Sequence, residues 1–429
     1  MICSIQKALL PLLLFALLSA CSSNNIYRSN FSNCVVSAQN SCESNSIQRY
    51  NMDSDNEYML SFVEIDDQGQ IRNREQMQAL LNQLYDMASK ESLLMSVFVH
   101  GWHHSAKPGD KNVESFKQSL EQLSHVEHTL NKNRPRKIVG VYVGWRGDSL
   151  DVPYLNSITF WERKNTAHEV GHLGMTELLL RLEEIKNVKN TLVPPVKSRL
   201  VIIGHSFGGA AVYSATSQIL ADRFVDSNSN KSFVDTAKGF GDLVVLLNPA
   251  FEALGYAPLY DLANARCSYM LEQQPKLVVL TSESDQATKI LFPLGRTLST
   301  IWESHGSVQR NDCKRPLNYD EGVADRNTVG HFEPFLTHEL HPATNKQVVQ
   351  YENIHKIWSE QDAAQAMKFG STELKILGKT APRNPYLNVK VDKLLMDGHN
   401  DIFRPEIVEF LRELTVLATT EPHRKSAEQ

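Results

Sequence analysis

The residues with the clearest chemical potential lie at positions 204–208, where the sequence reads GHSFG. This pentapeptide directly follows an apolar run at 199–203 and precedes small residues at 209–215 that suit a closely packed helix. A serine in a sharp turn between a strand and a helix is exposed above the carboxyl end of the strand, where its hydroxyl can attack a carbonyl carbon. The spacing therefore predicts a nucleophile at Ser206, and the alternative is an ordinary strand-to-helix turn.

A second motif, His100-Gly101-Trp102, follows another apolar run at 93–99. With the GHSFG motif it resembles the α/β-hydrolase superfamily, in which a His-Gly pair after the third strand contributes to the oxyanion hole. The resemblance implies that the backbone N–H groups of Trp102 and Phe207 bind the oxyanion. It also implies an α/β fold with a mostly parallel sheet and helices on both faces. Taken alone, the second motif is also compatible with a strand end that carries surface histidines.

The superfamily orders its triad along the chain as serine, acid and histidine. The acid is expected just past the strand after the next one, and there Asp285 follows the apolar run 277–281. Glu283 is the first alternative acid, and Glu252, after the preceding strand, is a weaker one. Asp285 could instead cap a helix that begins near Gln286.

Two histidines compete for the role of base. His399 follows the last expected strand and precedes an amphipathic helix, which is where the superfamily places its base. His331 is the alternative base, because with His338 it lies in a long inserted region that could line the substrate entrance. His331 could also be a polar residue at a strand edge.

The resemblance implies a serine hydrolase that needs no cofactor. His399 takes the proton of Ser206 as the hydroxyl attacks an acyl carbonyl, Asp285 orients the imidazole, and water then hydrolyses the acyl-enzyme. The expected substrate is a carboxylic ester, in a small molecule or a lipid, as in carboxylesterases and lipases. An amide or thioester remains an alternative because the same triad serves all three. A second class of function is a non-catalytic surface lipoprotein that has kept the fold.

Residues 168–172, with the sequence HEVGH, match the HExxH motif of zinc peptidases. The metzincin extension fails because Met175 and Leu178 occupy the positions of its glycine and third histidine. The nearest later carboxylates, Glu183 and Glu184, belong to the same expected helical region and not to a later helix. We therefore expect no catalytic metal, and a zinc peptidase is the least favoured alternative.

The first twenty residues, 1–20, predict a lipoprotein signal peptide. Lys7 supplies a positive start, and the apolar run 8–18 is too short to span a bilayer. Small residues before Cys21 resemble a bacterial lipobox, which implies lipidation of Cys21 and a lipid anchor in the cell envelope. Ser22 in place of aspartate favours the outer membrane, and the alternative is an ordinary secretory signal.

The rest of the chain divides into three expected parts. Residues 21–54 are rich in serine and asparagine after the lipidated cysteine and predict a flexible tether. Residues 55–418 form the catalytic domain, in which 286–385 is an insertion before the last strand, and 419–429 are a polar tail. Buried apolar runs alternate with helical patterns across this domain, which predicts an α/β fold. The expected strands are 58–65, 93–99, 138–143, 200–203, 243–249, 277–281 and 387–392, and helices are expected near 74–89, 112–131, 148–188 and from about 404.

The cysteines bear on the compartment of the protein, and the net charge bears on its binding partners. Four cysteines remain after Cys21, and an oxidising compartment allows two disulfides in three possible connectivities. One connectivity joins Cys34 to Cys42 in a local loop and Cys267 to Cys313 across the insertion. The 429 residues carry a formal net charge of −5, which gives no electrostatic case for nucleic-acid binding.

Overall fold

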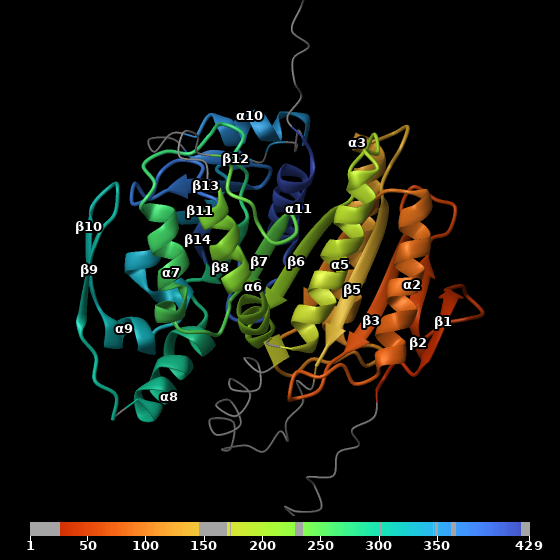
Figure 1. The fold of residues 1–429 in the computed structure, drawn as a ribbon, viewed down its shortest axis with the longest axis horizontal. Helices are drawn as coiled ribbons and strands as arrows, with labels where there is room; N and C mark the ends of the chain where they lie inside the picture. The colour runs from red at the N-terminus through yellow and green to blue at the C-terminus, as the bar shows by residue number, and fades with distance from the viewer. Residues whose placement is uncertain are drawn as a thin grey trace, which may run out of the picture.

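The computed structural model describes residues 26–145, 170–171, 173–227, 235–300, 302–345, 347, 351–361 and 366–421. Their centre is a mixed sheet of twelve strands in the order β1-β2-β3-β5-β4-β6-β7-β8-β14-β11-β13-β12 (Figure 1). The strands are β1 (Asn30–Val35), β2 (Asn45–Tyr50), β3 (Tyr58–Glu64), β4 (Leu93–Val99), β5 (Lys137–Gly144), β6 (Arg199–His205), β7 (Leu243–Leu247), β8 (Leu277–Ser282), β11 (His338–Pro342), β12 (Met367–Phe369), β13 (Thr372–Ile376) and β14 (Tyr386–Val391). The protein is therefore an α/β protein, as the alternation of patterns predicts.

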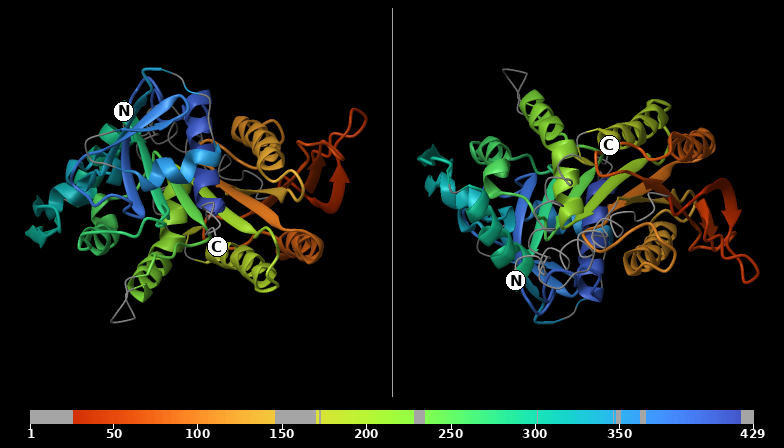
Figure 2. Two further views of the ribbon diagram at one scale, coloured as in Figure 1. Left: turned by 90° about the horizontal axis from the view of Figure 1, so that it is seen from above. Right: turned by 90° about the horizontal axis from the view of Figure 1, so that it is seen from below.

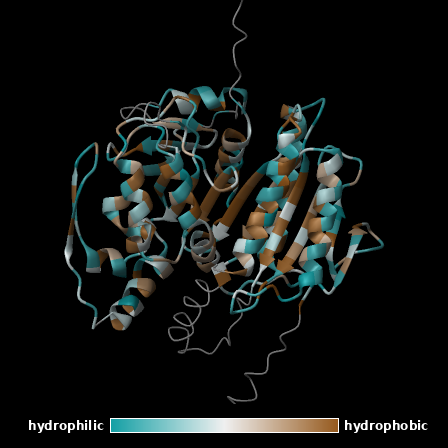
Figure 3. Cartoon of the chain, in the orientation of Figure 1, coloured by the Kyte–Doolittle hydropathy of each residue, from teal (hydrophilic) through white to brown (hydrophobic). Residues whose placement is uncertain are grey.

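The central part of this sheet is parallel throughout. Every pairing from β3 to β11 along the sheet order is parallel, whereas β2–β3, β11–β13 and β13–β12 are antiparallel. β4, β7 and β8 are buried along their whole length. Strands that are apolar throughout are stable only where helices cover both faces of the sheet, and Figure 3 shows this apolar centre.

Helices cover both faces of the sheet (Figure 2). One hydrophobic cluster joins the sheet to α2, α5, α6 and α7, and a second joins it to α3, α10 and α11. The bounds of these helices are α2 (Arg74–Lys90), α3 (Lys111–Leu130), α5 (Gly174–Thr191), α6 (Phe207–Asp226), α7 (Ala253–Asn264), α10 (Ile354–Ser359) and α11 (Pro405–Thr419). None of the helices in the described ranges is long and apolar enough to cross a membrane.

The helix boundaries follow from capping residues and apolar spacing. The Asn73 side chain accepts hydrogen bonds from the first N–H groups of α2, and Asp110 does the same for α3. Pro405 opens α11, where the missing N–H costs nothing. Ile407 and Phe410 on α11 are fully buried, so the apolar stripe that predicts this helix is the face that packs on the sheet.

The expectation of a flexible tether over 21–54 is wrong for much of that range. β1 pairs in parallel with β2, and β2 pairs with β3, so the main sheet begins at Asn30 and the folded unit extends beyond the expected limit of residue 55. Ile47 is buried in the core, and the Gln48 side chain donates hydrogen bonds to the backbone of Cys42 and Asn45. A composition rich in serine and asparagine concealed these short strands, in which several polar side chains, among them those of Asn45 and Gln48, form hydrogen bonds within the arm.

One part of the expected insertion at 286–385 belongs to the main sheet, and the other part does not. β11, β12 and β13 belong to this range and extend the main sheet beyond β14, so β14 is not an edge strand. The remaining elements of the range, besides α10, are not strands of this sheet. They are η1 (Ala287–Leu291), α8 (Phe292–Ser299), β9 (Ser307–Asn311), β10 (Pro316–Asp320), α9 (Glu321–Arg326), η2 (Val329–His331), η3 (Glu333–Phe335) and η4 (Tyr351–Asn353).

Two disulfides are present, and they follow one of the three connectivities that the sequence allows. Cys34 is bonded to Cys42 within the β1–β2 arm. Cys267, which follows α7, is bonded to Cys313 between β9 and β10. The second bond therefore ties the region outside the sheet to the helix layer.

Candidate active site

Ser206 stands between the last residue of β6 and the first residue of α6, in the turn that the GHSFG motif predicts. Its backbone has φ 56° and ψ −120°, a combination that is strained for a residue with a side chain. A side chain at Gly208 would overlap the carbonyl oxygens of Val99 and His100, because α6 passes directly against the end of β4. The glycine is needed for this close approach, and the strained turn presents Ser206 at the carboxyl end of the sheet.

The structure brings Ser206, His399 and Asp285 together in one hydrogen-bonded chain. His399 Nε2 lies 2.7 Å from Ser206 Oγ, and His399 Nδ1 lies 2.8 Å from Asp285 Oδ2. An ionised carboxylate only accepts hydrogen bonds, so the Nδ1 atom donates and Nε2 is left to accept the serine proton. This is the arrangement that a serine nucleophile, its base and an orienting acid require.

Asp285 is fully buried directly after β8. Its carboxylate accepts hydrogen bonds from the Ala287 backbone N–H at 2.9 Å and the Thr288 hydroxyl at 2.5 Å. Burial alone would raise the pKa of Asp285, but the charge of His399 and the hydrogen bonds from His399 and Thr288 outweigh it and lower this pKa. The residue also caps the turn that follows it, so both sequence interpretations of Asp285 hold at once.

His331, the alternative base, is linked to this hydrogen-bonded chain through Thr288. Its Nε2 atom is 3.0 Å from Thr288 Oγ1. Since Thr288 donates its only hydroxyl proton to Asp285, His331 Nε2–H donates to Thr288. Burial lowers the pKa of His331 to about 4, so its imidazole is neutral at neutral pH. The side chain therefore supports Asp285 through Thr288.

The backbone of His399 is held by two side chains from neighbouring strands. Asn248, directly after β7, donates its amide to the carbonyl oxygens of His399 at 2.8 Å and Gly398 at 3.2 Å, and it accepts from Ser282 N–H at 2.9 Å. His205 Nε2 lies 2.9 Å from the same His399 oxygen. A carbonyl oxygen only accepts, so His205 carries its proton on Nε2. The loop that bears the base is thus tied to β6, β7 and β8.

The loop after β4 lies against the serine turn. A side chain at Gly101 would contact both His205 and Ser206. The buried His100 ring shapes this loop, because its Nδ1 faces the Gly101 carbonyl oxygen at 2.7 Å and its Nε2 accepts from Trp145 N–H at 3.1 Å. Burial lowers the pKa of His100 to about 4, which suits a neutral ring with one donor and one acceptor.

The two expected oxyanion donors come from segments that border the nucleophile. Phe207 is the first residue of α6, immediately after Ser206. Trp102 lies in the loop after β4, packs against the main hydrophobic cluster and stacks on His103. The first turn of a helix directs its N–H groups toward bound negative charge, so the position of Phe207 suits this role.

The other sequence candidates lie away from the chain of Ser206, His399 and Asp285. Glu283 pairs with Lys390 at 3.7 Å and accepts from Lys393 N–H. Glu252 pairs with Arg296 at 3.1 Å beside α7. His338 is buried on β11. In the HEVGH motif at 168–172, His168, Glu169 and His172 lie outside the described residues, and so does Cys21.

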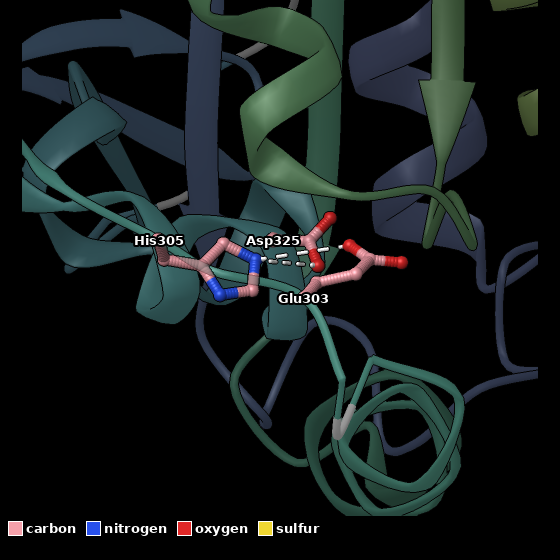
Figure 4. Close-up of side chains that lie close together, drawn as sticks. All are labelled: Glu303, His305 and Asp325. Carbon is pink, nitrogen blue, oxygen red and sulfur yellow. Dashed lines mark ion pairs between the residues drawn. The ribbon is translucent and has the colours of Figure 1, made fainter.

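A further cluster of charged groups, Glu303, His305 and Asp325, lies beside α9 (Figure 4). His305 Nε2 is 3.5 Å from Asp325 and 3.9 Å from Glu303. Arg296 also donates to Asp325 at 2.7 Å, so a guanidinium already neutralises the buried carboxylate. The cluster is an ion-pair network that fastens α8 to α9, and a cation there would face the positive charge of Arg296.

Comparison with known proteins identifies no relative: no family model, curated protein or solved structure matches this chain. The site is therefore interpreted from its own geometry. Thr288, Asn248 and His205 were not predicted as parts of the site. His205 lies inside the GHSFG motif, and Asn248 directly follows an apolar strand. Their expected position at the carboxyl edge of the sheet could therefore have indicated that both residues belong to the site.

Proposed function

We propose that this protein is a serine hydrolase with an α/β-hydrolase fold that cleaves a carboxylic ester through an acyl-enzyme. The observation that carries the proposal is the continuous chain from Ser206 through His399 to Asp285, with distances of 2.7 and 2.8 Å. Each of the three side chains follows a different strand or strand–helix connection of the parallel sheet. Such a convergence at the carboxyl edge favours catalysis over a purely structural role.

The chemistry follows from the proton positions. Ser206 Oγ attacks the acyl carbonyl carbon while its proton moves to His399 Nε2. Asp285 keeps the imidazole in the correct tautomer and stabilises its cationic form. The alcohol leaves with the proton from His399, and a water molecule then attacks the acyl-enzyme with the same histidine as base. The proposal needs no cofactor for any of these steps.

The proposed oxyanion hole consists of the backbone N–H groups of Phe207 and Trp102. They would bind the negative charge that develops on the carbonyl oxygen in the transition state. Loss of one such donor typically lowers the rate by about 10²–10³. The loop geometry set by His100 supports this assignment, because it keeps the Trp102 segment against the serine turn.

The test is covalent labelling of the full chain with a fluorophosphonate probe, followed by mass mapping of the modified residue. We expect labelling at Ser206 that is lost in Ser206→Ala and falls by at least 10³ in His399→Ala. Ser217→Ala, on the same helix α6, is the matched control and should label normally. A folded protein that does not label, or labelling that survives His399→Ala but fails in His331→Ala, would contradict the assignment.

We further propose that Cys21 carries a lipid anchor that attaches the enzyme to the bacterial cell envelope, at the outer membrane. The lipobox-like residues before Cys21 support it, and the two disulfides suit an oxidising compartment. Metabolic labelling with a palmitate analogue should mark the wild-type protein and leave Cys21→Ser unmarked. Incorporation into Cys21→Ser would show that the anchor is elsewhere.

A further inference from the structure

Helix α8 carries an apolar surface that faces solvent. The structure exposes its large apolar side chains well beyond the level of the core, to 76% for Leu298 and 93% for Trp302 just after the helix. Contiguous exposed apolar residues mark contact sites with other molecules. We call this surface the α8 face, and it consists of Ile290, Leu291, Leu294, Leu298 and Trp302.

The spacing of the α8 face is helical, so its members lie on one side. Ile290, Leu294 and Leu298 are separated by four residues each, which aligns them along a continuous stripe. The opposite side of the helix packs against the rest of the protein. There Phe292 is fully buried, and Arg296 pairs with Asp325 and Glu252. The helix is therefore fixed in the orientation that exposes its apolar stripe.

The helical segment that carries this stripe contains no acidic residue, although the exposed Glu303 follows Trp302 directly. Between Gln286 and Trp302 the sequence has two basic residues, Lys289 and Arg296, and no acidic residue. Apolar side chains on one face, basic residues and a terminal tryptophan are the composition of helices that lie in the interface of a bilayer. A protein partner would not require this absence of negative charge.

The position of the α8 face matches the expected point of attachment. Asp285 leads directly into η1 and α8, so the α8 face belongs to the carboxyl edge of the sheet. The described chain starts at the same edge, because the N–H groups of Tyr27 and Arg28 donate to Glu64 at the end of β3. Figure 1 shows α8 and the start of the described chain on the same, lower side of the molecule.

Because the β1–β2 arm is folded, only a short segment links Cys21 to this edge of the sheet. Ile26, the first described residue, lies five positions after Cys21. Fully extended, this segment spans at most about 18 Å. A lipid on Cys21 would therefore hold the start of the folded chain close to the bilayer, at the edge of the sheet to which the α8 face also belongs. A tether of thirty residues would have left the orientation free.

We propose that the α8 face lies in the interface of a phospholipid bilayer and orients the carboxyl edge, with Ser206, toward the membrane. This membrane contact is a property separate from the proposed hydrolysis. It also indicates the class of substrate, which is an ester that partitions into the bilayer or lies on its surface. The supply of substrate rests on the proposed hydrolase, and the short link rests on the lipid anchor proposed at Cys21. The orientation rests on the apolar stripe, its charge and the short link to Cys21.

The experiment uses the full, lipidated chain reconstituted into vesicles of phosphatidylethanolamine and phosphatidylglycerol with brominated acyl chains. Bromine quenches tryptophan fluorescence at short range, and the Trp302 contribution is the difference between wild-type protein and Trp302→Phe. We expect brominated lipid to reduce this contribution at least twofold relative to unbrominated vesicles. The double variant Leu294→Glu/Leu298→Glu should abolish the quenching while Ser206 labelling in detergent stays unchanged.

The matched control is Leu180→Glu/Leu192→Glu, which alters an exposed leucine of α5 and the exposed leucine that follows this helix, and it should leave the quenching intact. A Trp302 contribution that brominated lipid leaves unchanged overturns the proposal. Acrylamide then tells whether the residue is free in water or covered by protein. The readout involves no substrate, so absence of hydrolase activity and absence of membrane contact are separate results.

Discussion

At the residue scale, the groups that do not touch a substrate decide whether the proposed triad of Ser206, His399 and Asp285 can act. Asp285 is oriented by Thr288, and Thr288 is in turn oriented by His331. His399 is held through its own carbonyl oxygen by Asn248 and His205. A base that must swing between an attacking and a leaving oxygen within one catalytic cycle benefits from a fixed backbone.

Thr288→Val tests the support of the acid. The change keeps the side-chain volume but removes the hydrogen bond to Asp285 and the link to His331. We expect kcat/KM for a soluble ester to fall about tenfold, which corresponds to roughly 1.4 kcal/mol in the transition state, with KM nearly unchanged. Thr297→Val, on the exposed surface of α8, is the control. Equal rates for both variants would remove Thr288 from the site.

Gly208→Ala tests the close approach of α6 to β4. The new methyl group would overlap the carbonyl oxygens of Val99 and His100, so the serine turn must move. We expect the rate of fluorophosphonate labelling to fall by about 10² or more, since displacement of the reacting atoms by 1 Å costs about this much. Gly255→Ala in α7 meets no atom within 4 Å and should stabilise its helix by up to about 1 kcal/mol. Normal labelling of Gly208→Ala would contradict the prediction.

At the element scale, the sequence predicts the parallel centre of the sheet closely, and also α2, α3, α6 and α11. It did not predict α7, and in the helical region expected at 148–188 the described helix α5 covers Gly174–Thr191. Apolar runs bounded by turn residues give the buried strands, and capping side chains give the helix starts. The edges were harder to predict. β1 and β2 are short, polar on the outside and stabilised by a disulfide and side-chain hydrogen bonds, and β12 and β13 are short strands within a range that has no clear period.

The same distinction holds for the site. Ser206, Asp285 and His399 were predictable because motifs and chain order constrain them. Thr288 is only three positions from Asp285, but its contact with His331 spans 43 positions. Asn248 acts through hydrogen bonds to the carbonyl oxygens of His399 and Gly398, which depend on how strand ends and loops meet in space. No local pattern in one sequence records such contacts between residues more than a hundred positions apart, as between Asn248 and His399.

The two disulfides should differ in their effect on stability. Cys34–Cys42 closes a separation of 8 residues, and Cys267–Cys313 closes one of 46. Loop-closure entropy predicts losses of about 2.6 and about 4 kcal/mol when each pair is replaced by serine. Urea unfolding of the two double variants provides the measurement. A larger loss for the shorter loop would show that packing of the β1–β2 arm outweighs chain entropy.

At the scale of the whole molecule, a buried carboxyl group in the α11 layer couples stability to pH. Burial first, and then the neighbouring charge of Glu409, raises the pKa of Glu413 from 4.5 to about 8. The folded state therefore holds a proton that the unfolded chain releases above pH 4.5. The stability due to this group is fully present below pH 4.5 and is lost as the pH rises toward 8.

Glu413→Gln should remove this dependence, because glutamine cannot ionise. We expect wild-type protein and variant to have similar melting temperatures at pH 4.5. At pH 8.5 the variant should be more stable, by an amount on the order of 4 kcal/mol at most. Glu360→Gln, an exposed change on the neighbouring α10 side, is the control. A gap that stays constant between the two pH values would mean that Glu413 ionises normally.

The strained backbone of Ser206 has a consequence for the evolution of this chain. With φ 56° and ψ −120°, glycine would fit the turn better, and relief of the strain contributes roughly 1–3 kcal/mol. The substitution that would most readily stabilise the protein at this position therefore removes the hydroxyl group of Ser206. Under selection for heat resistance alone, lineages should drift toward Ser206→Gly. Persistence of the serine in a natural population would then record continuous selection for chemistry.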